Sequence, residues 1–171
     1  LGLFLFLRIR AAGSDSRFEA IKITPPRFFI AWTLQGVWIT FTASAAVLAI
    51  TSVQNADFGW LSTLGLLLWL MGFTLEVVAD QQKNRFRKNP ANANQFISTG
   101  LWSFCRHPNY TGEIMLWLGI ALIAFPVLEG WRLMGLFSPV FVAFLLIKGS
   151  GIPLLERAAE AKWGNTAAYQ H

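Results

Sequence analysis

The chain has 171 residues, of which 54% are hydrophobic and only 13% are charged, and its mean hydropathy is +0.47. Soluble domains carry about 25% charged residues, so this composition excludes an ordinary soluble domain and indicates an integral membrane protein. The net charge of +5 does not indicate nucleic-acid binding, because the basic residues lie in loops that flank apolar stretches. A single cysteine excludes an internal disulfide, and two histidines leave too few ligands for a structural zinc site.

The chain begins with an apolar run, Leu1 to Leu7, that is too short to span a bilayer by itself. Arg8 and Arg10 follow this run, whereas a signal peptide would place its basic residues before the apolar segment. We therefore interpret the run as the end of a truncated transmembrane helix. On this interpretation residues 1–171 form a single transmembrane domain that lacks its N-terminal part and a few residues at its C-terminus.

Four longer apolar stretches follow, at about Phe28 to Val53, Phe58 to Ala79, Ile114 to Leu128 and Arg132 to Leu155. All but the third exceed the roughly 20 residues that cross a bilayer core. The third is shorter, and a helical lead-in from Tyr110 to Glu113 extends it. The pattern predicts an all-α, polytopic membrane bundle with at least four transmembrane helices besides the truncated one.

Prolines mark the ends of these stretches. Pro25-Pro26 predicts an extended approach to the first full span, and Asn89-Pro90 predicts the end of the helix that leaves the second. Pro108 suits the first turn of a helix, so the third span is expected to begin just after His107.

Basic residues are distributed unevenly between the loops. They gather in two loops and are absent from the connector Gln54 to Asp57. By the positive-inside rule, the two basic loops, including the RHPNYTGE segment, and the C-terminal tail are expected to face the cytoplasm. The turns near Asp57 and Glu129 then face the opposite side. The basic residues concerned are Arg8, Arg10, Arg17, Lys22 and Arg27 in one loop and Lys83, Arg85, Arg87, Lys88 and Arg106 in the other.

The RHPNYTGE segment, residues 106–113, crowds polar and ionisable side chains beside an apolar run. Ionisable groups at a membrane are costly unless they are paired, solvated or bound to a ligand, so the segment is a candidate site. Together with the free N–H groups of a helix start, Arg106 and His107 are expected to donate to phosphate or another anion. The alternative is that both side chains only reach for lipid headgroups.

The same segment continues with polar residues on the first helical turns. Asn109 and Glu113 are one turn apart, and Glu113 is expected to accept hydrogen bonds from hydroxyl or amide donors. Alternatively, Tyr110 belongs to an aromatic belt and Glu113 pairs with a neighbouring arginine.

A second polar cluster lies at the end of the preceding span. Glu76 and Asp80 are four residues apart, and Lys83 and Arg87 continue about one turn at a time. Each member has a local alternative, such as a pair between Asp80 and Asn84. Because two clusters recur where consecutive spans reach the same side of the membrane, we expect them to converge on one binding site.

Two further polar residues interrupt apolar spans. Gln35 is a candidate substrate-binding residue, with an interhelical hydrogen bond as the alternative. Lys148 precedes Gly149-Ser150-Gly151 and is free to snorkel, pair or touch a ligand. The chain contains no G-x-G-x-x-G, Walker A, H-E-x-x-H or G-x-S-x-G motif, so a bound nucleotide must be held by helix ends and loops.

Four segments of the chain together resemble a known membrane family: RFFIAWTLQGVW, ADQQKNRFRKNPANANQFISTGLW, RHPNYTGEIMLWLG and SGIPLLERAAEAKWG. The resemblance is to the steroid-dehydrogenase-like family with a domain of unknown function, and it covers nearly the whole chain. That family is related to the steroid 5-alpha-reductases and the sterol C14 and delta-7 reductases, and more distantly to the isoprenylcysteine carboxyl and phospholipid methyltransferases.

The resemblance implies a multi-helical membrane protein with a cytoplasm-facing cofactor cavity, which in the 5-alpha-reductases holds NADPH. Glu76, Asp80 and Arg87 match a stretch of cofactor contacts in those enzymes, although the reductases typically have Asn where this chain has Glu76. Lys148 stands where a small or apolar residue is expected, a departure that would signal altered or lost activity.

The RHPNYTGE segment matches several branches of the superfamily. Asn109 and Glu113 match the N-[YF]-x-G-E element of the 5-alpha-reductases. Arg106, His107 and Tyr110 match the sterol reductases and the methyltransferases better, so the resemblance implies nucleotide binding without deciding which nucleotide.

The methyltransferase relatives combine such a segment with a C-terminal acidic pair that holds S-adenosylmethionine. Glu156 and Glu160 match that pair only loosely, because Arg157 follows Glu156 where the methyltransferases have a second glutamate. This departure favours the reductase branch.

Three functions follow as hypotheses. The leading one is NADPH-dependent reduction of an enone or polarised double bond in a lipophilic, steroid-like or isoprenoid substrate, with a catalytic acid that the sequence does not identify. The second is methyl transfer from S-adenosylmethionine to a lipid or prenylated substrate. The third is a non-catalytic membrane subunit of a larger complex. Expected partners are the substrate and membrane lipids, and a nucleic acid is not expected.

Overall fold

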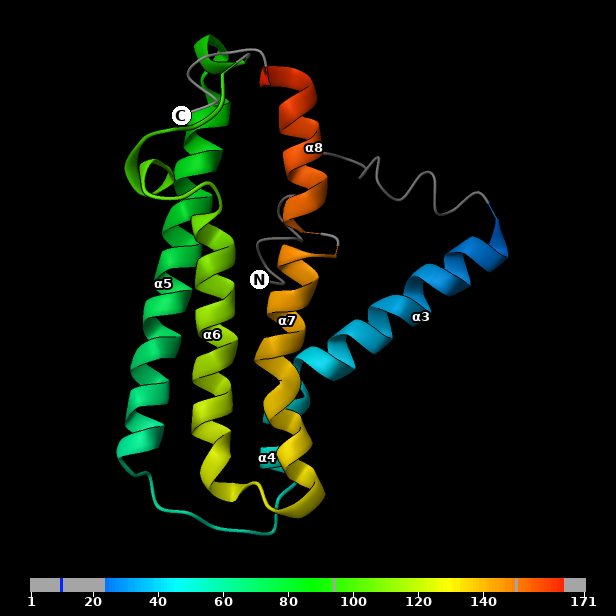
Figure 1. Cartoon of the computed structure of the whole chain (residues 1–171), viewed down its shortest axis with the longest axis vertical. Coiled ribbons are helices and arrows are strands. Elements are labelled where there is room, and N and C mark those ends of the chain that lie inside the picture. Colours follow the sequence, from blue (N-terminus) through cyan, green and yellow to red (C-terminus); the bar gives the residue numbers. More distant parts are fainter. Residues whose placement is uncertain (1–9, 11–23, 94, 150, 165–171) are drawn as a thin grey trace. The chain divides into compact units, whose positions relative to one another are not determined.

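The computed structural model describes residues 10, 24–93, 95–149 and 151–164. The apolar run from Leu1 to Leu7 and the tail after residue 164 lie outside the described residues, so the truncated helix stays a prediction. Within the described part every regular element is helical, which confirms the all-α class. The longer helices are α3 (Pro25–Thr42), α4 (Ser44–Ile50), α5 (Trp60–Lys88), α6 (Pro108–Ala124), α7 (Ser138–Ile147) and α8 (Ile152–Trp163) (Figure 1). Short 3-10 helices are η1 (Pro90–Asn92), η2 (Gly100–Ser103), η3 (Phe125–Val127) and η4 (Gly130–Phe137).

The chain forms two compact units, Leu1–Thr40 and Phe41–His171. Most of α3 belongs to the first unit, and the helices from α4 to α8 belong to the second. Everything that follows on packing concerns the second unit.

Three helical segments are long and apolar enough to cross a membrane: Trp60–Lys88, Pro108–Val127 and Gly130–Trp163. The helices α3 and α4, which are separated by a break at Ala43, count as a fourth if the pair forms one span. These segments support the integral membrane protein that the composition indicated.

The first predicted span differs in two details from the structure. It is interrupted between Thr42 and Ser44, where the Ser44 hydroxyl donates to the Phe41 carbonyl at 2.8 Å. Such a local bond competes with continuation of the helix. The extended approach predicted at Pro25-Pro26 is wrong, because α3 already begins at Pro25, and the fixed φ of proline suits a first helical turn.

The other predicted ends are confirmed: α5 ends at Lys88, just before Asn89-Pro90, and α6 begins at Pro108. The last predicted span is divided between α7 and α8. At this break a Cβ on Gly151 would lie 2.5 Å from the Leu146 carbonyl oxygen, so the local turn is too tight for a larger residue.

The helices α5 and α6 pack against each other through two pairs of glycines. A Cβ on Gly72 would lie 2.6 Å from the Gly112 carbonyl oxygen, and a Cβ on Gly65 would lie 2.7 Å from that of Gly119. Only glycine allows backbones to approach this closely. The glycines are seven residues apart on each helix, so both pairs lie on one face. This contact sets the position of the α6 N-terminus against α5.

Two hydrogen bonds join the end of α3 and α4 to the beginning of α7 and to η4. The Ser138 hydroxyl, which is buried, donates to the Thr42 carbonyl at 2.6 Å, and Arg132 Nη1 donates to the Leu48 carbonyl at 2.9 Å. A small core of Ala45, Ala121, Ala124 and Leu128 lies beside them. These contacts hold the ends of the helices that are remote from the two polar clusters.

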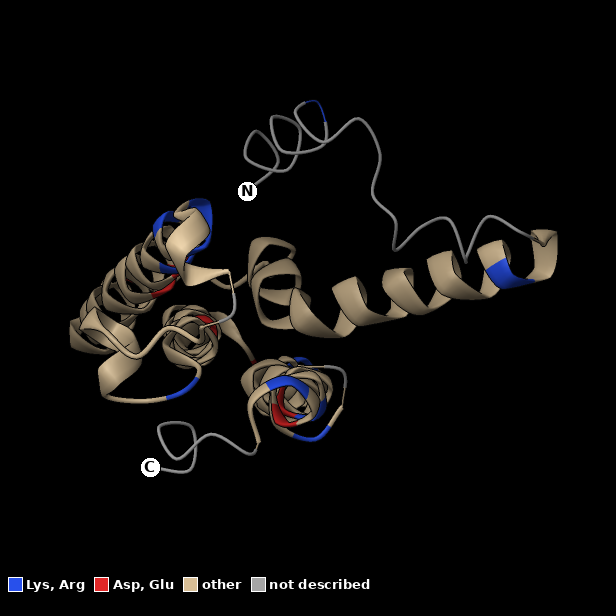
Figure 2. Ribbon diagram, turned by 90° about the horizontal axis from the view of Figure 1, so that it is seen from above, with Lys and Arg blue, Asp and Glu red and all other residues tan. Residues whose placement is uncertain are grey.

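The helix α5 is longer than a bilayer core requires. Its 29 residues extend over about 44 Å at 1.5 Å per residue, against a hydrocarbon thickness of about 30 Å. Its last turn contains Arg85, Arg87 and Lys88, and Lys and Arg also occur along α8 (Figure 2). The polar end of α5 therefore extends beyond the hydrocarbon when its apolar beginning lies within it.

Candidate functional site

A cavity of about 540 Å³ lies between the last turns of α5, the loop of residues 95–107 and α8. This volume falls within the roughly 300–1,000 Å³ that ligand pockets occupy. The lining combines aromatic rings with basic side chains and one carboxylate. Its members include Lys83, Phe86, Arg87, Phe96, Trp102, Cys105, Arg106, His107, Glu156, Lys162 and Trp163.

The loop is held against α5 by a turn at Gly100. Gly100 has a φ of 63°, in the left-handed region, and a Cβ there would lie 2.7 Å from the Gln82 side-chain oxygen. The same oxygen accepts a hydrogen bond from the Leu101 amide at 3.0 Å. Next in the chain, the buried Trp102 donates from Nε1 to the Ala79 carbonyl at 3.0 Å. These bonds fix Trp102 as one wall of the cavity.

Basic side chains from two helices face the cavity. Lys83 Nζ lies 4.5 Å from the centroid of the Trp102 ring, and Arg87 is one turn further along α5. Neither Lys83 nor Arg87 forms an ion pair with a carboxylate in the described part of the chain. From α8, Lys162 donates to the Ala93 carbonyl at 3.1 Å and has no carboxylate partner within the part of the chain that the structure describes. The cavity therefore attracts anions.

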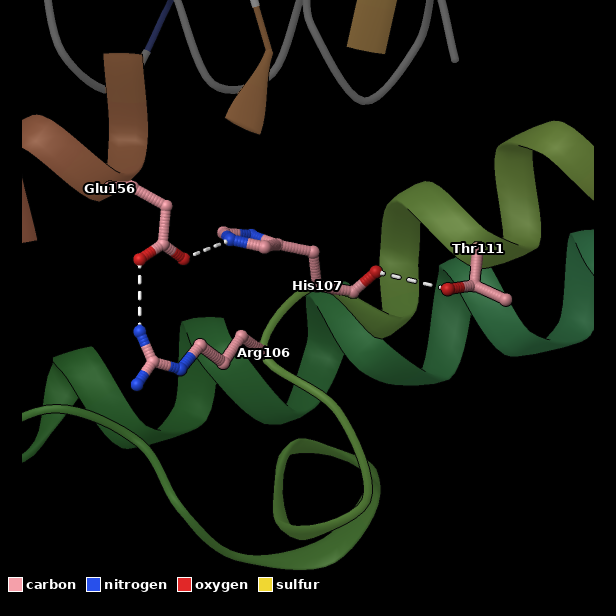
Figure 3. Close-up of polar contacts among 4 residues, drawn as sticks. All are labelled: Arg106, His107, Thr111 and Glu156. Carbon is pink, nitrogen blue, oxygen red and sulfur yellow. Dashed lines mark hydrogen bonds and ion pairs between the residues drawn. The ribbon is translucent and has the colours of Figure 1, made fainter. Parts of the chain in front are cut away.

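The carboxylate of Glu156, on α8, links this helix to the beginning of α6. One oxygen accepts from Arg106 Nη1 at 3.0 Å, and the other lies 2.7 Å from His107 Nε2 (Figure 3). His107 is the residue immediately before α6, and its ring stacks on that of Tyr110 at 5.6 Å between centroids. Glu156 thus compensates the charge of Arg106. Lys83, Arg87 and Lys162 have no such carboxylate partner among the described residues.

Three of the eight predicted cofactor-binding residues line this cavity: Arg87, Arg106 and His107. The two predicted clusters also come together outside this cavity. The turn of α5 at Glu76, where the first cluster begins, is in contact with the turn of α6 at Gly112. A Cβ on Gly112 would lie 2.7 Å from the Glu76 backbone nitrogen. Glu113 follows Gly112 in the chain.

The remaining predicted residues lie on these facing turns and do not line the 540 Å³ cavity. They are Glu76 and Asp80 on α5 and Asn109, Tyr110 and Glu113 on α6. The Asn109 side-chain oxygen is buried and has no hydrogen-bond partner among the described residues. Gln35 lies in α3, in the first unit, so its predicted contact with a substrate stays a prediction. Lys148 caps the end of α7 and is exposed.

The sequence did not single out several residues of the cavity. Trp102 and Lys162 were not assigned a role, and Glu156 was considered only as half of an acidic pair. All three lie within segments that carry the family resemblance, which was the available signal. Their convergence depends on α8 returning to the α6 N-terminus, a long-range contact that no local pattern predicts.

Comparison with known proteins gives a family and several relatives. Over residues 1–171 the chain matches the family model described as "Protein of unknown function (DUF1295)". It is similar to the probable O-methyltransferase ustE of Ustilaginoidea virens, with 28% identity over 75% of this chain and 49% of the relative. It is also similar to the Delta(14)-sterol reductase erg24 of Schizosaccharomyces pombe, with 35% identity over 47% of this chain and 22% of the relative. A third relative is the 3-oxo-5-alpha-steroid 4-dehydrogenase 1 of Bos taurus, with 30% identity over 42% of this chain and 29% of the relative.

The chain matches no more than about half the length of these relatives. No solved structure matches the chain.

Proposed function

The chain belongs to the DUF1295 family, and on that premise we propose that it is a membrane-embedded, NADPH-dependent reductase of a lipophilic substrate. The substrate class that we propose is a steroid-like or isoprenoid molecule with an enone or another polarised double bond. The names of two relatives, a Delta(14)-sterol reductase and a 3-oxo-5-alpha-steroid 4-dehydrogenase, support a reductase. The apolar spans support a substrate that is soluble in the membrane.

The excess of positive charge around the cavity is the observation that carries this proposal. Lys83, Arg87 and Lys162 face the cavity without a carboxylate partner among the described residues, and Glu156 compensates Arg106. Phosphate groups are the usual partners of such clusters. NADPH carries a pyrophosphate and a ribose phosphate, so its charge complements this lining.

Aromatic rings beside the cations suit the base of a nucleotide. Phe96 and Trp163 lie 6.1 Å apart between ring centroids, one from the loop and one from the end of α8. Stacking of a base on an aromatic ring contributes about 1–3 kcal/mol. The chemistry that NADPH supplies when bound is hydride transfer. Asn109 and Glu113 are the residues that we propose to orient the nicotinamide.

A second candidate function is methyl transfer from S-adenosylmethionine. It is favoured by the match to a probable O-methyltransferase, which covers 75% of this chain. S-adenosylmethionine has no phosphate and carries a sulfonium, an ammonium and a carboxylate group, so its net charge is positive. A cavity with an excess of cations therefore favours the polyanionic NADPH over it, and this charge argument ranks methyl transfer second.

A binding titration of the purified protein in detergent with NADPH and with S-adenosylmethionine tests the proposal. We expect NADPH to bind and S-adenosylmethionine to bind at least tenfold more weakly. The double substitution Lys83→Ala and Arg87→Ala removes two phosphate donors. It is expected to weaken NADPH binding by roughly a hundredfold, because a hydrogen bond to a charged group contributes about 1.5–3 kcal/mol.

The helix α5 also provides the matched control. Arg85 and Lys88 are exposed basic residues of the same helix, and they do not line the cavity. Substitution of both by Ala removes the same net charge and is expected to change NADPH affinity by less than about threefold. Preferential binding of S-adenosylmethionine, or equal losses in the two double variants, would overturn the assignment.

We also propose that the cavity faces the cytoplasm. The basic residues that gather at this end of α5 and in the following loop support this orientation under the positive-inside rule.

A further inference from the structure

The cavity has two groups of cations without a carboxylate partner among the described residues, and the groups come from different helices. Lys83 and Arg87 stand about one turn apart on α5, and Lys83 Nζ lies 4.5 Å from the centroid of the Trp102 ring. Lys162 stands near the end of α8, and its Nζ lies 4.9 Å from the centroid of the adjacent Trp163 ring. Each group therefore combines positive charge with an aromatic ring.

Lys162 is held where the loop after α5 meets the end of α8. Its Nζ donates to the Ala93 carbonyl at 3.1 Å, and the Phe96 ring of the same loop lies 6.1 Å from the Trp163 ring between centroids. An ammonium group has three N–H donors, and the structure gives Lys162 no other hydrogen bond among the described residues. Because Lys162 is exposed and lines the cavity, its other donors can reach a ligand there.

The adenosine half of NADPH is the part that suits this cavity. Asn109 and Glu113, the residues proposed for the nicotinamide, do not line the cavity, which leaves it for the other end of the dinucleotide. That end carries phosphate in two places. The pyrophosphate is attached at the 5′ carbon of the ribose, whereas the 2′-phosphate is attached beside the carbon that bears the adenine. A cation next to rings on which the adenine stacks is therefore placed to bind the 2′-phosphate.

The carboxylate of the cavity is not placed to select NADH instead. Rossmann domains that select NAD(H) use a carboxylate that accepts from the free 2′-hydroxyl, and those that select NADP(H) use a cation near the 2′-phosphate. This difference in chemistry does not depend on the fold. Glu156 is the one carboxylate among the described lining residues, and its oxygens lie 3.0 Å from Arg106 Nη1 and 2.7 Å from His107 Nε2. Two partners already engage it, so the lining favours a phosphate over a free 2′-hydroxyl.

We propose that Lys162 binds the 2′-phosphate of NADPH and thereby selects NADPH over NADH, while Lys83 and Arg87 bind the pyrophosphate that both dinucleotides carry. This assignment rests on the proposed function, because it distributes the phosphates of the cofactor named there over the cations of the cavity. Lys162 is then a specificity-determining residue, whereas the two cations of α5 contribute affinity for either dinucleotide.

Titrations of the purified protein in detergent with NADPH and with NADH separate these roles. The unsubstituted protein is expected to bind NADPH about tenfold more tightly. Lys162→Ala is expected to weaken NADPH binding roughly tenfold and to leave NADH binding within about twofold, because a hydrogen bond to a charged group is strong but solvent exposure reduces its contribution. If Lys162 acted only through its bond to Ala93, both affinities would fall by the same factor, and that result would overturn the assignment.

Three other variants complete the comparison. Lys162→Arg keeps the charge and is expected to keep the preference for NADPH. Arg157→Ala is the matched control, because it removes an exposed positive charge from the same helix outside the cavity lining, and either affinity should change by less than about twofold. Lys83→Ala combined with Arg87→Ala is expected to weaken both dinucleotides by similar factors. A loss confined to NADPH in this double variant would place the 2′-phosphate on α5 and contradict the role of Lys162.

A fragment of the cofactor tests the cavity without the nicotinamide. Adenosine 2′,5′-bisphosphate is expected to displace NADPH at a lower concentration than adenosine 5′-monophosphate does, and Lys162→Ala is expected to remove this difference. Equal displacement by the two fragments, or equal affinity of the unsubstituted protein for NADPH and NADH, would overturn this inference alone. Failure of both dinucleotides to bind the unsubstituted protein would overturn the proposed function as well.

Discussion

The contact between α5 and α6 makes a quantitative prediction for Gly112→Ala. The added Cβ would lie 2.6 Å from the Gly72 carbonyl oxygen and 2.7 Å from the Glu76 backbone nitrogen. Ordinary van der Waals contact begins near 3.4 Å, so the helices must separate locally by about 0.8 Å, the difference between 3.4 and 2.6 Å. Overpacking of this kind is expected to lower the free energy of unfolding by about 1–3 kcal/mol.

Equilibrium unfolding in mixed micelles, followed by tryptophan fluorescence, measures this loss. Gly36→Ala is the control, because a Cβ at Gly36 meets no described atom within 4 Å. It is expected to leave stability unchanged or to raise it by up to about 1 kcal/mol, because Ala favours a helix over Gly, and in either case not to lower it. Gly72→Ala strains the same contact, so the two substitutions at Gly72 and Gly112 together should cost less than the sum of their separate effects. A Gly112→Ala variant as stable as the unsubstituted protein would refute the close approach of these helices.

Three further predictions concern other parts of the second unit. Trp102→Phe keeps a ring but removes the donor to the Ala79 carbonyl, so stability should fall by about 1 kcal/mol in the same unfolding assay, and no change would argue against that bond. Cys105, the single cysteine, is exposed and lines the cavity, so an impermeant maleimide should label it only after right-side-out vesicles are permeabilised, and NADPH should slow the labelling. Labelling of intact vesicles would reverse the proposed orientation. Arg132→Gln loses the bond to the Leu48 carbonyl, and should lower stability by about 1–2 kcal/mol while NADPH affinity stays within twofold in a titration.

Local patterns in the sequence predict much of the fold. The apolar stretches and Pro108 predict where α5 and α6 lie, because hydrophobicity and proline geometry act on neighbouring residues. The glycines at Gly65 and Gly72 and their counterparts on α6 are also visible as a spacing of seven residues. The break between α7 and α8 coincides with Lys148 and the Gly149-Ser150-Gly151 sequence, but a window average of hydrophobicity over the long apolar stretch conceals it.

The site is less predictable than the helices for a physical reason. The ion pair of Arg106 with Glu156 joins residues that are 50 positions apart, and its formation depends on where α8 lies relative to the beginning of α6. The residues of the RHPNYTGE segment were predicted because ionisable groups near apolar spans are costly wherever they lie. Lys162 stands on a polar helix, where a lysine costs nothing, so composition gives no reason to select it.

The charge of Glu156 bears on the choice between the two cofactors. A carboxylate is the strongest acceptor for an ammonium group, and the Glu156 carboxylate already accepts from Arg106 and lies within hydrogen-bond distance of His107. S-adenosylmethionine would have to compete with these donors while Lys83 and Arg87 repel its positive charge. A phosphate group meets the opposite situation, because neither Lys83 nor Arg87 is ion-paired with a carboxylate of the described residues. NADPH affinity is therefore expected to fall steeply with ionic strength in a binding titration, whereas binding of S-adenosylmethionine is expected to strengthen as salt screens the repulsion.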